Sequence, residues 1–423
     1  MNMLNYAFIL LTSVGFIGST IILLNMPLFG YDQADMPDFV VDFYEKKIIV
    51  WLTMSWMMIA IPIGALISNL FFKNRSMKSV MQNFKKTELR FFFNLSNHRF
   101  YLTLLVGTIL LIIYNLITLP DTSALSALLN GGSVVEGQKI RRNSIQGSGI
   151  FLVDIFLNIS TLSIFNLMAF IMAFKTCIFK WRILFLIGFI SVTFFYLSNA
   201  SMGNFIWYVL SIGIIRSLMG GKFIKVYEGF FLLLFLGVIF SYFKGYDDFS
   251  IATVLNKYVG NRIVFGQIIG TYFSFEVFPL VSDYLWFSST GRAVHNFLDS
   301  NYQESYGIVM MNIYNPSGVL AGTAGHFTTN FMGEAWANFG ILGIIFAPLW
   351  VGIIVQILNR WLLSHGRNIG FVAIYGYMTT SLGYATDFIG FYYPLGYILQ
   401  FISFVIFYWI IYHLVALPLL LKA

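Results

Sequence analysis

Three groups of polar residues have the types and spacing for chemistry on a charged substrate. The first group is Arg141 and Arg142, whose adjacent guanidinium groups are suited to bidentate binding of phosphate or pyrophosphate oxygens. The alternative is that they anchor the chain at lipid headgroups or pair with Glu136 or Asp154. We interpret both arginines as substrate-binding residues.

The second group belongs to a long segment late in the chain. Gly291 lets the backbone bend closely around a ligand, so the next residue, Arg292, is predicted to bind an anion. Arg262 is either a second anion ligand or a solvated loop charge. His295 would share a helical face with Arg292, but a single histidine is more often structural. The segment also contains the carboxylates Glu276 and Asp283.

The third group lies on a helix that is expected to begin near Gly333. Glu334 occupies its first turn, where the helix dipole favours a carboxylate, and Asn338 follows one turn later on the same face. Glu334 or His326 is the predicted acceptor of a proton from a hydroxyl nucleophile, with helix capping as the alternative for Glu334. Trp336 either stacks on a sugar or sits in an interfacial aromatic belt, which we favour.

Two further features accompany the third group. Residues 314–326 are rich in glycine and are expected to form a flexible loop around a substrate. Asp387 ends a later apolar run beside the aromatic residues 391–393 and Pro394. We interpret it as the partner of an outer arginine that binds substrate, rather than as a catalytic carboxylate.

The composition sets the class of protein. Of the 423 residues, 58% are hydrophobic and 10% are charged, and the mean hydropathy is +0.78. A soluble domain carries about 25% charged residues, so a water-soluble enzyme is excluded, and the abundance of Phe and Tyr excludes disorder. The single cysteine and the scattered histidines form no metal-binding pattern. We therefore expect no metal and no cofactor.

The elements that must position these residues are membrane helices. A helix needs roughly 20 apolar residues to cross a bilayer core. Ten runs of that kind are present, near residues 3–30, 48–72, 100–120, 150–174, 183–200, 204–220, 226–243, 333–357, 369–389 and 395–418.

The distribution of charge predicts the orientation. Of the 25 Lys and Arg, 16 fall in one set of loops and 5 in the opposite short loops. The remaining 4 lie in the long segment 244–332. By the positive-inside rule the first side is cytoplasmic, and both termini lie there. The net charge of +7 then needs no nucleic-acid partner. The basic loop 73–99 is interpreted as an anchor on anionic headgroups rather than as a specific lipid or nucleotide site.

The outer side carries the long loops. Its largest segment, residues 244–332, is too apolar for a linker. We expect residues 263–275 and 277–287 to form short interfacial or re-entrant helices. Arg141 and Arg142 also lie on this side, where an arginine pair is unusual and therefore suggests a function.

These residues resemble a known family. The outer arginine pair, the Thr-Gly-Arg at 290–292 and the motif Gly-Glu-Ala-x-x-Asn-Phe-Gly-x-x-Gly at 333–343 resemble the bacterial O-antigen polymerase (Wzy-like) family of oligosaccharide repeat-unit polymerases. The architecture matches over most of the chain, and the sequence matches around residues 315–343.

The resemblance implies a membrane glycosyltransferase that uses glycans on undecaprenyl pyrophosphate, at the periplasmic leaflet and without a metal. Arg141, Arg142, Arg262 and Arg292 would bind pyrophosphates, and Glu334 or His326 would act on the acceptor hydroxyl. The expected partners are the lipid-linked oligosaccharides, membrane lipids and, by resemblance alone, a chain-length regulator protein. The bacterial inner membrane is the expected location.

Two other functions stay open. An O-antigen ligase would use a similar arrangement of arginine and histidine. A lipid-linked oligosaccharide flippase or another exporter is the second alternative, although cationic residues within the helical runs are almost absent. A channel or sensor has no support beyond hydropathy.

The predicted fold class is an all-α polytopic membrane protein with about 10 transmembrane helices, or about 11–12 if part of residues 262–288 forms a helical hairpin. The predicted division is residues 1–243, with seven membrane helices; 244–332, the outer segment; and 333–423, with the last three helices.

Overall fold

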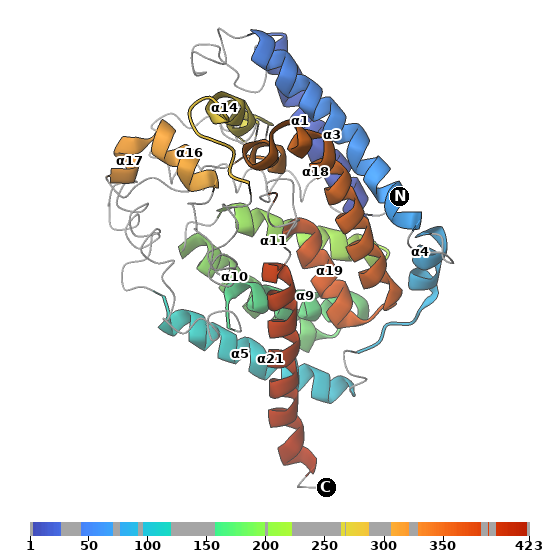
Figure 1. Ribbon diagram of the computed structural model, residues 1–423. Coiled ribbons are helices and arrows are strands. Elements are labelled where there is room, and N and C mark those ends of the chain that lie inside the picture. Colours follow the sequence, from blue (N-terminus) through green and yellow to red (C-terminus); the bar gives the residue numbers. More distant parts are fainter. Residues whose placement is uncertain are drawn as a thin grey trace. The chain divides into compact units, whose positions relative to one another are not determined.

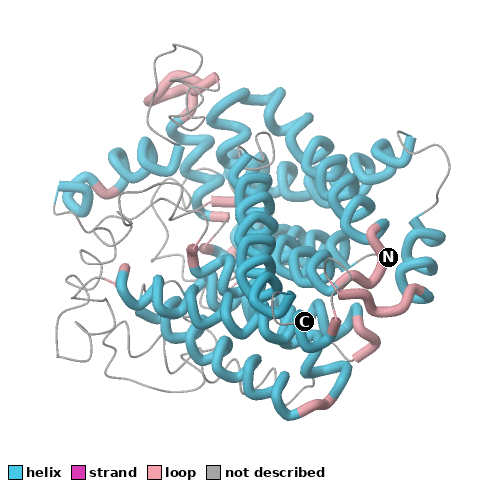
Figure 2. Tube along the Cα trace, turned by 90° about the horizontal axis from the view of Figure 1, so that it is seen from below, coloured by secondary structure: helices cyan, strands magenta, loops and turns pink. Residues whose placement is uncertain are grey.

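The computed structural model of the chain describes twelve stretches of the sequence. These are residues 3–26, 44–70, 77–91, 96–119, 157–198, 202–221, 264–266, 268–286, 306–320, 329–381, 388 and 395–420. They form helices joined by loops, without a strand among the described residues (Figures 1 and 2). The all-α prediction is therefore confirmed for this part of the chain.

Five described helices are long and apolar enough to cross a membrane. They cover Glu45–Leu70, Asn97–Ile117, Ile159–Thr176, Phe179–Ser198 and Phe331–Ser364. Shorter apolar helices lie at Thr12–Leu23, Asn204–Leu218, Ile369–Thr380 and Phe401–Leu414. These helices indicate a multi-pass membrane protein. The predicted run at residues 226–243 lies outside the described residues.

The chain divides into two compact units. The first comprises residues 1–73, 226–357 and 382–393, and the second comprises 74–225, 358–381 and 394–423. The predicted three-part division of the sequence stays a prediction.

The first unit contains six described helices. They are α1 (Met3–Leu23), α3 (Tyr44–Leu70), α14 (Ile269–Val277), α16 (Tyr306–Tyr314), α17 (Pro316–Leu320) and most of α18 (Phe331–Ser364). Helices α1 and α3 lie side by side, where the Trp51 indole donates to the Thr20 hydroxyl at 3.1 Å. The Trp56 indole in turn donates to the Ile345 carbonyl of α18 at 3.2 Å.

The second unit is built around one buried helix. Its helices are α4 (Met77–Lys86), α5 (Asn97–Ile117), α9 (Ile159–Thr176), α10 (Phe179–Ser198), α11 (Met202–Leu218), the end of α18, α19 (Ile369–Ser381) and α21 (Leu395–Leu420). Helix α9 is buried along most of its length and packs against α5, α10, α11, α19 and α21. A helix that is apolar on all sides has no polar face to turn toward water, so it takes the central position.

Two expectations for the outer segment are wrong in detail. Helix α14 ends at Val277, and the chain beyond it forms turns and an extended stretch up to residue 286 rather than a second helix. Pro279 lacks the amide hydrogen that a continued helix would need. At about 14 Å, α14 is too short to cross a bilayer, so the described part of residues 262–288 forms no transmembrane hairpin.

The stretch predicted as a flexible loop is helical in its described part. Helix α16 ends at Tyr314, and α17 begins with Pro316, whose missing amide hydrogen costs nothing at a first helical position. The Asn315 side chain accepts from the Gly318 amide at 3.0 Å and caps α17. Residues 321–328 lie outside the described part of the chain.

Candidate functional site

The helix that carries the recognised motif is broken. Gly340 has φ 56° and ψ −134°, which divides α18 into a short first half up to Phe339 and a long second part. The second part, residues 341–364, is about 36 Å long and alone suffices to cross a hydrocarbon core of about 30 Å. The first half is therefore not needed for the crossing, and Glu334 lies in it.

Close packing explains why glycine occupies the break. A Cβ atom on Gly340 would lie 2.8 Å from the Tyr284 ring, in a backbone region that side chains rarely adopt. A Cβ atom on Gly343 would lie 2.0 Å from the carbonyl oxygen of Ala335. The second part of α18 thus folds back against the first half, and the glycines of the motif have a structural role.

The break frees backbone carbonyls, and the outer segment satisfies them. In an unbroken helix, Ala337 and Asn338 would accept hydrogen bonds from the amides four residues later. Instead, Leu285 donates to Ala337 at 2.9 Å and Trp286 donates to Asn338 at 3.2 Å. Helix breaks at membrane depth persist only where such groups find partners in the protein.

Asn330 makes the cap at the start of α18. Its side-chain oxygen accepts from the Met332 amide at 2.9 Å, and Asn330 is fully buried. The capping alternative for Glu334 stays open, because Asn330 satisfies only one of the amides at this helix end. Asn330 was not among the predicted residues, although an asparagine directly before an apolar helical run is a known start signal.

Glu334 and Asn338 share one face, as the spacing predicts. The Asn338 side-chain amide donates to the Glu334 backbone carbonyl at 3.0 Å. Glu334 is 2% exposed and Asn338 is 1% exposed. Burial of a carboxylate is costly unless other groups compensate it, so such a position usually serves a function.

Buried hydroxyl groups surround the first turn of α18. The hydroxyls of Thr271 and Thr329 lie 3.3 Å apart, and those of Ser274 and Tyr306 lie 2.5 Å apart. A Cβ atom on Gly333 would meet Thr329 and Ser274, which places this cluster directly against the motif helix. The first turn of α18 thus packs against polar as well as apolar groups at Gly333.

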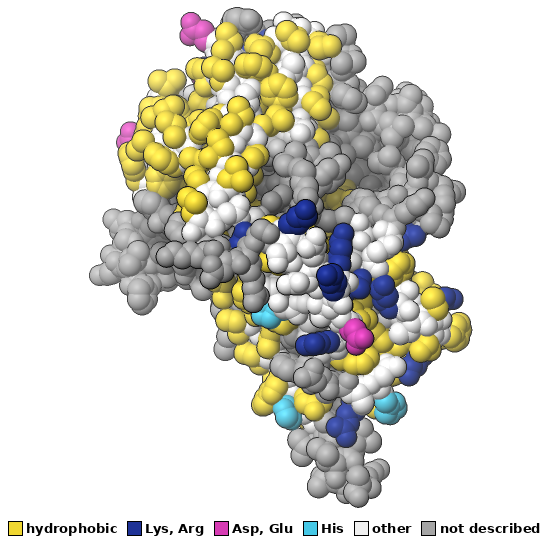
Figure 3. All heavy atoms as spheres, turned by 90° about the vertical axis from the view of Figure 1, so that its right-hand side faces the viewer, with side chains coloured by type: hydrophobic (Ala, Val, Ile, Leu, Met, Phe, Trp, Pro, Cys, Tyr) yellow, Lys and Arg dark blue, Asp and Glu magenta, His cyan; other side chains and the backbone are white. Residues whose placement is uncertain are grey.

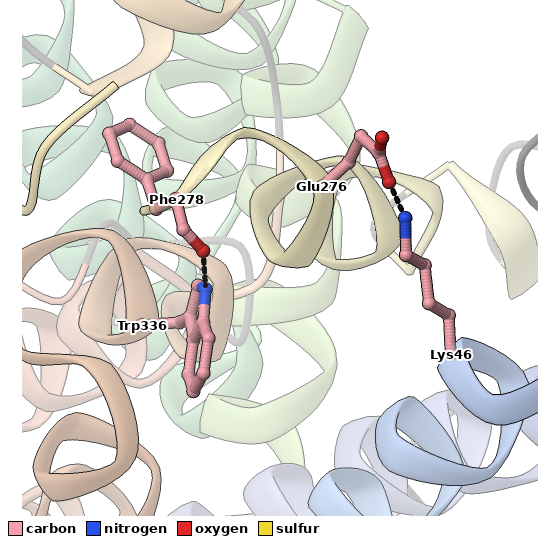
Figure 4. A network of polar contacts seen from close by, with 4 residues as sticks. All are labelled: Lys46, Glu276, Phe278 and Trp336. Carbon is pink, nitrogen blue, oxygen red and sulfur yellow. Dashed lines mark hydrogen bonds and ion pairs between the residues drawn. The ribbon is translucent and has the colours of Figure 1, made fainter. Parts of the chain in front are cut away.

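Trp336 is part of the packing of the first unit. Its indole donates to the Phe278 carbonyl at 2.8 Å (Figure 4), and its ring contacts Phe275 and Tyr284. This packing accounts for the aromatic side chain without a sugar ligand. The predicted position in an interfacial belt stays a prediction.

The carboxylates of the outer segment have separate positions. Glu276 on α14 forms an ion pair with Lys46 at the start of α3 (Figure 4). Lys47, the residue after Lys46, is 2% exposed and donates to the Asn25 side chain at 2.9 Å. Asp283 is exposed. Glu276 thus connects α14 with α3, and this pairing was not foreseen.

Burial changes the acidity of two tyrosines near the motif. Burial raises the pKa of Tyr314 to about 12, and the ring of Tyr314 packs edge-on against Phe273. Burial also raises the pKa of Tyr284, whose ring faces Gly340. Both phenols stay protonated at neutral pH and can serve as hydrogen-bonding groups, not as bases.

The other predicted site residues lie outside the described residues. They are Arg141, Arg142, Arg262, Arg292, His295, His326 and Asp387. The structure therefore brings Glu334 and Asn338 together, and the predicted arginine site stays a prediction. Among the described residues there is no group of three or more His, Cys, Asp or Glu that could hold a metal ion.

Comparison with known proteins found no relative of this chain. Neither a family model, nor a curated protein, nor a solved structure matches the chain.

Proposed function

We propose that the protein is a membrane glycosyltransferase that polymerises oligosaccharide repeat units carried on undecaprenyl pyrophosphate. The products would be O-antigen, capsule or exopolysaccharide. The observation that carries this proposal is Glu334, a buried carboxylate on the broken motif helix, one residue after the glycine that packs against the hydroxyls of Thr329 and Ser274.

The proposed setting is the bacterial inner membrane. About ten helices would cross it, with both termini in the cytoplasm and residues 244–332 on the periplasmic side. The apolar helices of the described residues support a multi-pass protein, and the charge distribution of the loops supports the orientation.

The proposed chemistry needs two kinds of group. An acceptor hydroxyl attacks the anomeric carbon of the donor glycan, and the bond from that carbon to the pyrophosphate oxygen breaks. Glu334 or His326 takes the hydroxyl proton, and the leaving pyrophosphate takes the bonding electron pair. Arg292, with Arg262, Arg141 and Arg142, would stabilise the charge on the pyrophosphates without a metal. Asp387 would orient an arginine, and Asn338 would bind substrate.

Glu334→Gln tests this proposal with little change in shape. In a bacterium that lacks the native gene, we expect the lipopolysaccharide or capsule ladder to collapse to core plus one repeat. Loss of general base catalysis typically costs roughly 10²–10⁴-fold in rate, which removes a visible ladder. Glu88→Gln, an identical change at an exposed acid of the second unit, should leave the ladder intact.

The products distinguish the alternative functions. Polymer that accumulates on the lipid carrier would indicate a ligase, and repeat units held on the cytoplasmic side would indicate a flippase. An unchanged ladder in Glu334→Gln, with the variant present in membranes at the normal level, would contradict the role of Glu334. Arg292→Ala, compared with Arg292→Lys, tests the pyrophosphate site in the same assay.

A further inference from the structure

The second unit carries an excess of positive charge at its helix ends. Its described residues include eleven Lys and Arg and one acid, Glu88. The cations are Lys78, Lys85, Lys86, Arg90, Arg99, Lys175, Lys180, Arg182, Arg216, Arg360 and Arg367. Lys and Arg side chains gather on the face drawn in Figure 3. Glu88 is exposed and makes no ion pair with any described residue.

Two of these cations converge on one residue. The Lys175 ammonium, in the last turn of α9, donates to the Met219 carbonyl at 2.8 Å. The Arg367 guanidinium lies 4.0 Å from the Met219 sulfur through Nη2. The two like charges are close enough to interact with each other. Lys175 is exposed, so water screens this repulsion in part, and an anion between the two groups would be attracted to both.

Arg367 is held in place by its backbone rather than by its side chain. Its carbonyl accepts from the Arg90 amide at 3.0 Å, and the Arg90 carbonyl accepts from the Ile369 amide at 3.0 Å. Asn368 caps α19 by accepting from the Gly370 amide at 3.0 Å. These bonds fix the backbone from which the Arg367 side chain extends toward Met219.

The guanidinium itself is poorly satisfied by the protein. The Nε atom of Arg367 is buried and has no hydrogen-bond acceptor, and the thioether of Met219 is a weak one. A buried donor without an acceptor is unfavourable. Guanidinium and ammonium groups together match the several oxygens of a phosphate, with the guanidinium donating in a fork and the ammonium acting as a point charge.

We propose that Lys175 and Arg367 form a binding site for a phosphate group. The source is either the headgroup of an anionic phospholipid or a free phosphate. The site lies in the second unit and uses none of the residues assigned to glycosyl transfer. In the predicted orientation it faces the cytoplasmic leaflet, which carries anionic lipids.

The test measures binding, not polymer formation. The purified protein in neutral detergent is titrated with short-chain phosphatidylglycerol, short-chain phosphatidylcholine, inorganic phosphate, or sodium chloride at matched ionic strength. The midpoint of thermal unfolding is followed by tryptophan fluorescence. We expect a saturable rise with phosphatidylglycerol or inorganic phosphate and none with sodium chloride. A rise with phosphatidylglycerol alone identifies a lipid headgroup, and an equal rise with inorganic phosphate identifies free phosphate.

Variants separate the site from general surface charge. Arg367→Gln should weaken the binding about tenfold or more, because a charge-assisted hydrogen bond is lost. Arg367→Lys keeps the charge but not the fork, so its binding should lie between that of Arg367→Gln and that of the unaltered protein. Arg182→Gln removes an exposed cation of the same unit and should change the binding less than about twofold. Lys175→Met also removes the bond to Met219, so its fold is checked by circular dichroism.

The proposal is overturned by either of two results. One is the absence of a saturable rise in the unaltered protein with both phosphatidylglycerol and inorganic phosphate. The other is an equal loss of binding in Arg182→Gln and Arg367→Gln, which would mean that anion binding depends only on the total charge of the protein.

Discussion

The backbone amide of Leu285 donates to the carbonyl of Ala337 at 2.9 Å, and this bond joins the outer segment to the broken helix α18. The bond exists because Gly340 interrupts the helix three residues later and leaves the Ala337 carbonyl without its usual donor. The chain that follows α14 thus supplies hydrogen-bond donors to the end of the half-helix that carries Glu334. Its position depends on the outer segment as well as on its own sequence.

The glycines at the break should tolerate no side chain. Gly343→Ala should lower the free energy of unfolding by about 3 kcal/mol, because the new methyl group meets the Ala335 carbonyl, which is backbone and has little room to move. Denaturation in sodium dodecyl sulfate measures the change. Gly220→Ala is the matched control: it has φ 90° but nothing within 4 Å, so we expect a loss of about 1 kcal/mol. Equal losses at the two positions would contradict the packing explanation.

The ion pair between Lys46 and Glu276 should contribute modestly to stability. Its side chains are 17% and 30% exposed, so solvent screens the interaction in part. A double-mutant cycle with Lys46→Met and Glu276→Gln should give a coupling energy of about 1 kcal/mol that decreases at high salt. A coupling energy near zero would show that α14 is held against α3 by apolar contacts alone.

Trp336→Phe should affect stability and not polymer length. The substitution removes the hydrogen bond to the Phe278 carbonyl, at a cost of about 1 kcal/mol, while an aromatic ring still packs on Phe275. The thermal midpoint and the polysaccharide ladder are read from the same variant. A normal midpoint with a shortened ladder would instead assign Trp336 to sugar binding.

Tyr314 should make the protein sensitive to alkaline pH. Burial raises the pKa of Tyr314 to about 12, whereas a tyrosine in the unfolded chain has a pKa of about 10. The unfolded state therefore loses its proton first, and the contribution of this group is complete below about pH 10 and falls as the pH rises to about 12. The thermal midpoint of Tyr314→Phe should decline less over this interval than that of the unaltered protein. Parallel declines would show that Tyr314 ionises as easily in the folded protein as in the unfolded chain.

Local patterns were sufficient for several features of this protein. The apolar runs predict helices because a run of that length buries itself in lipid or core whatever its neighbours are. Nine of the ten runs overlap described helices, and the all-α class follows from them. The alignment of Glu334 with Asn338 is equally local, since it depends only on helical periodicity.

Other features required the tertiary structure. Nothing in the motif 333–343 alone shows that Gly340 breaks the helix, and its contact with the Tyr284 ring comes from a distant part of the chain. The pairing of Lys46 with Glu276 and the meeting of Lys175 with Arg367 join residues far apart in the chain. Contacts of this kind are decided by how helices pack, and the hydrophobic pattern of one segment carries no information about its partner.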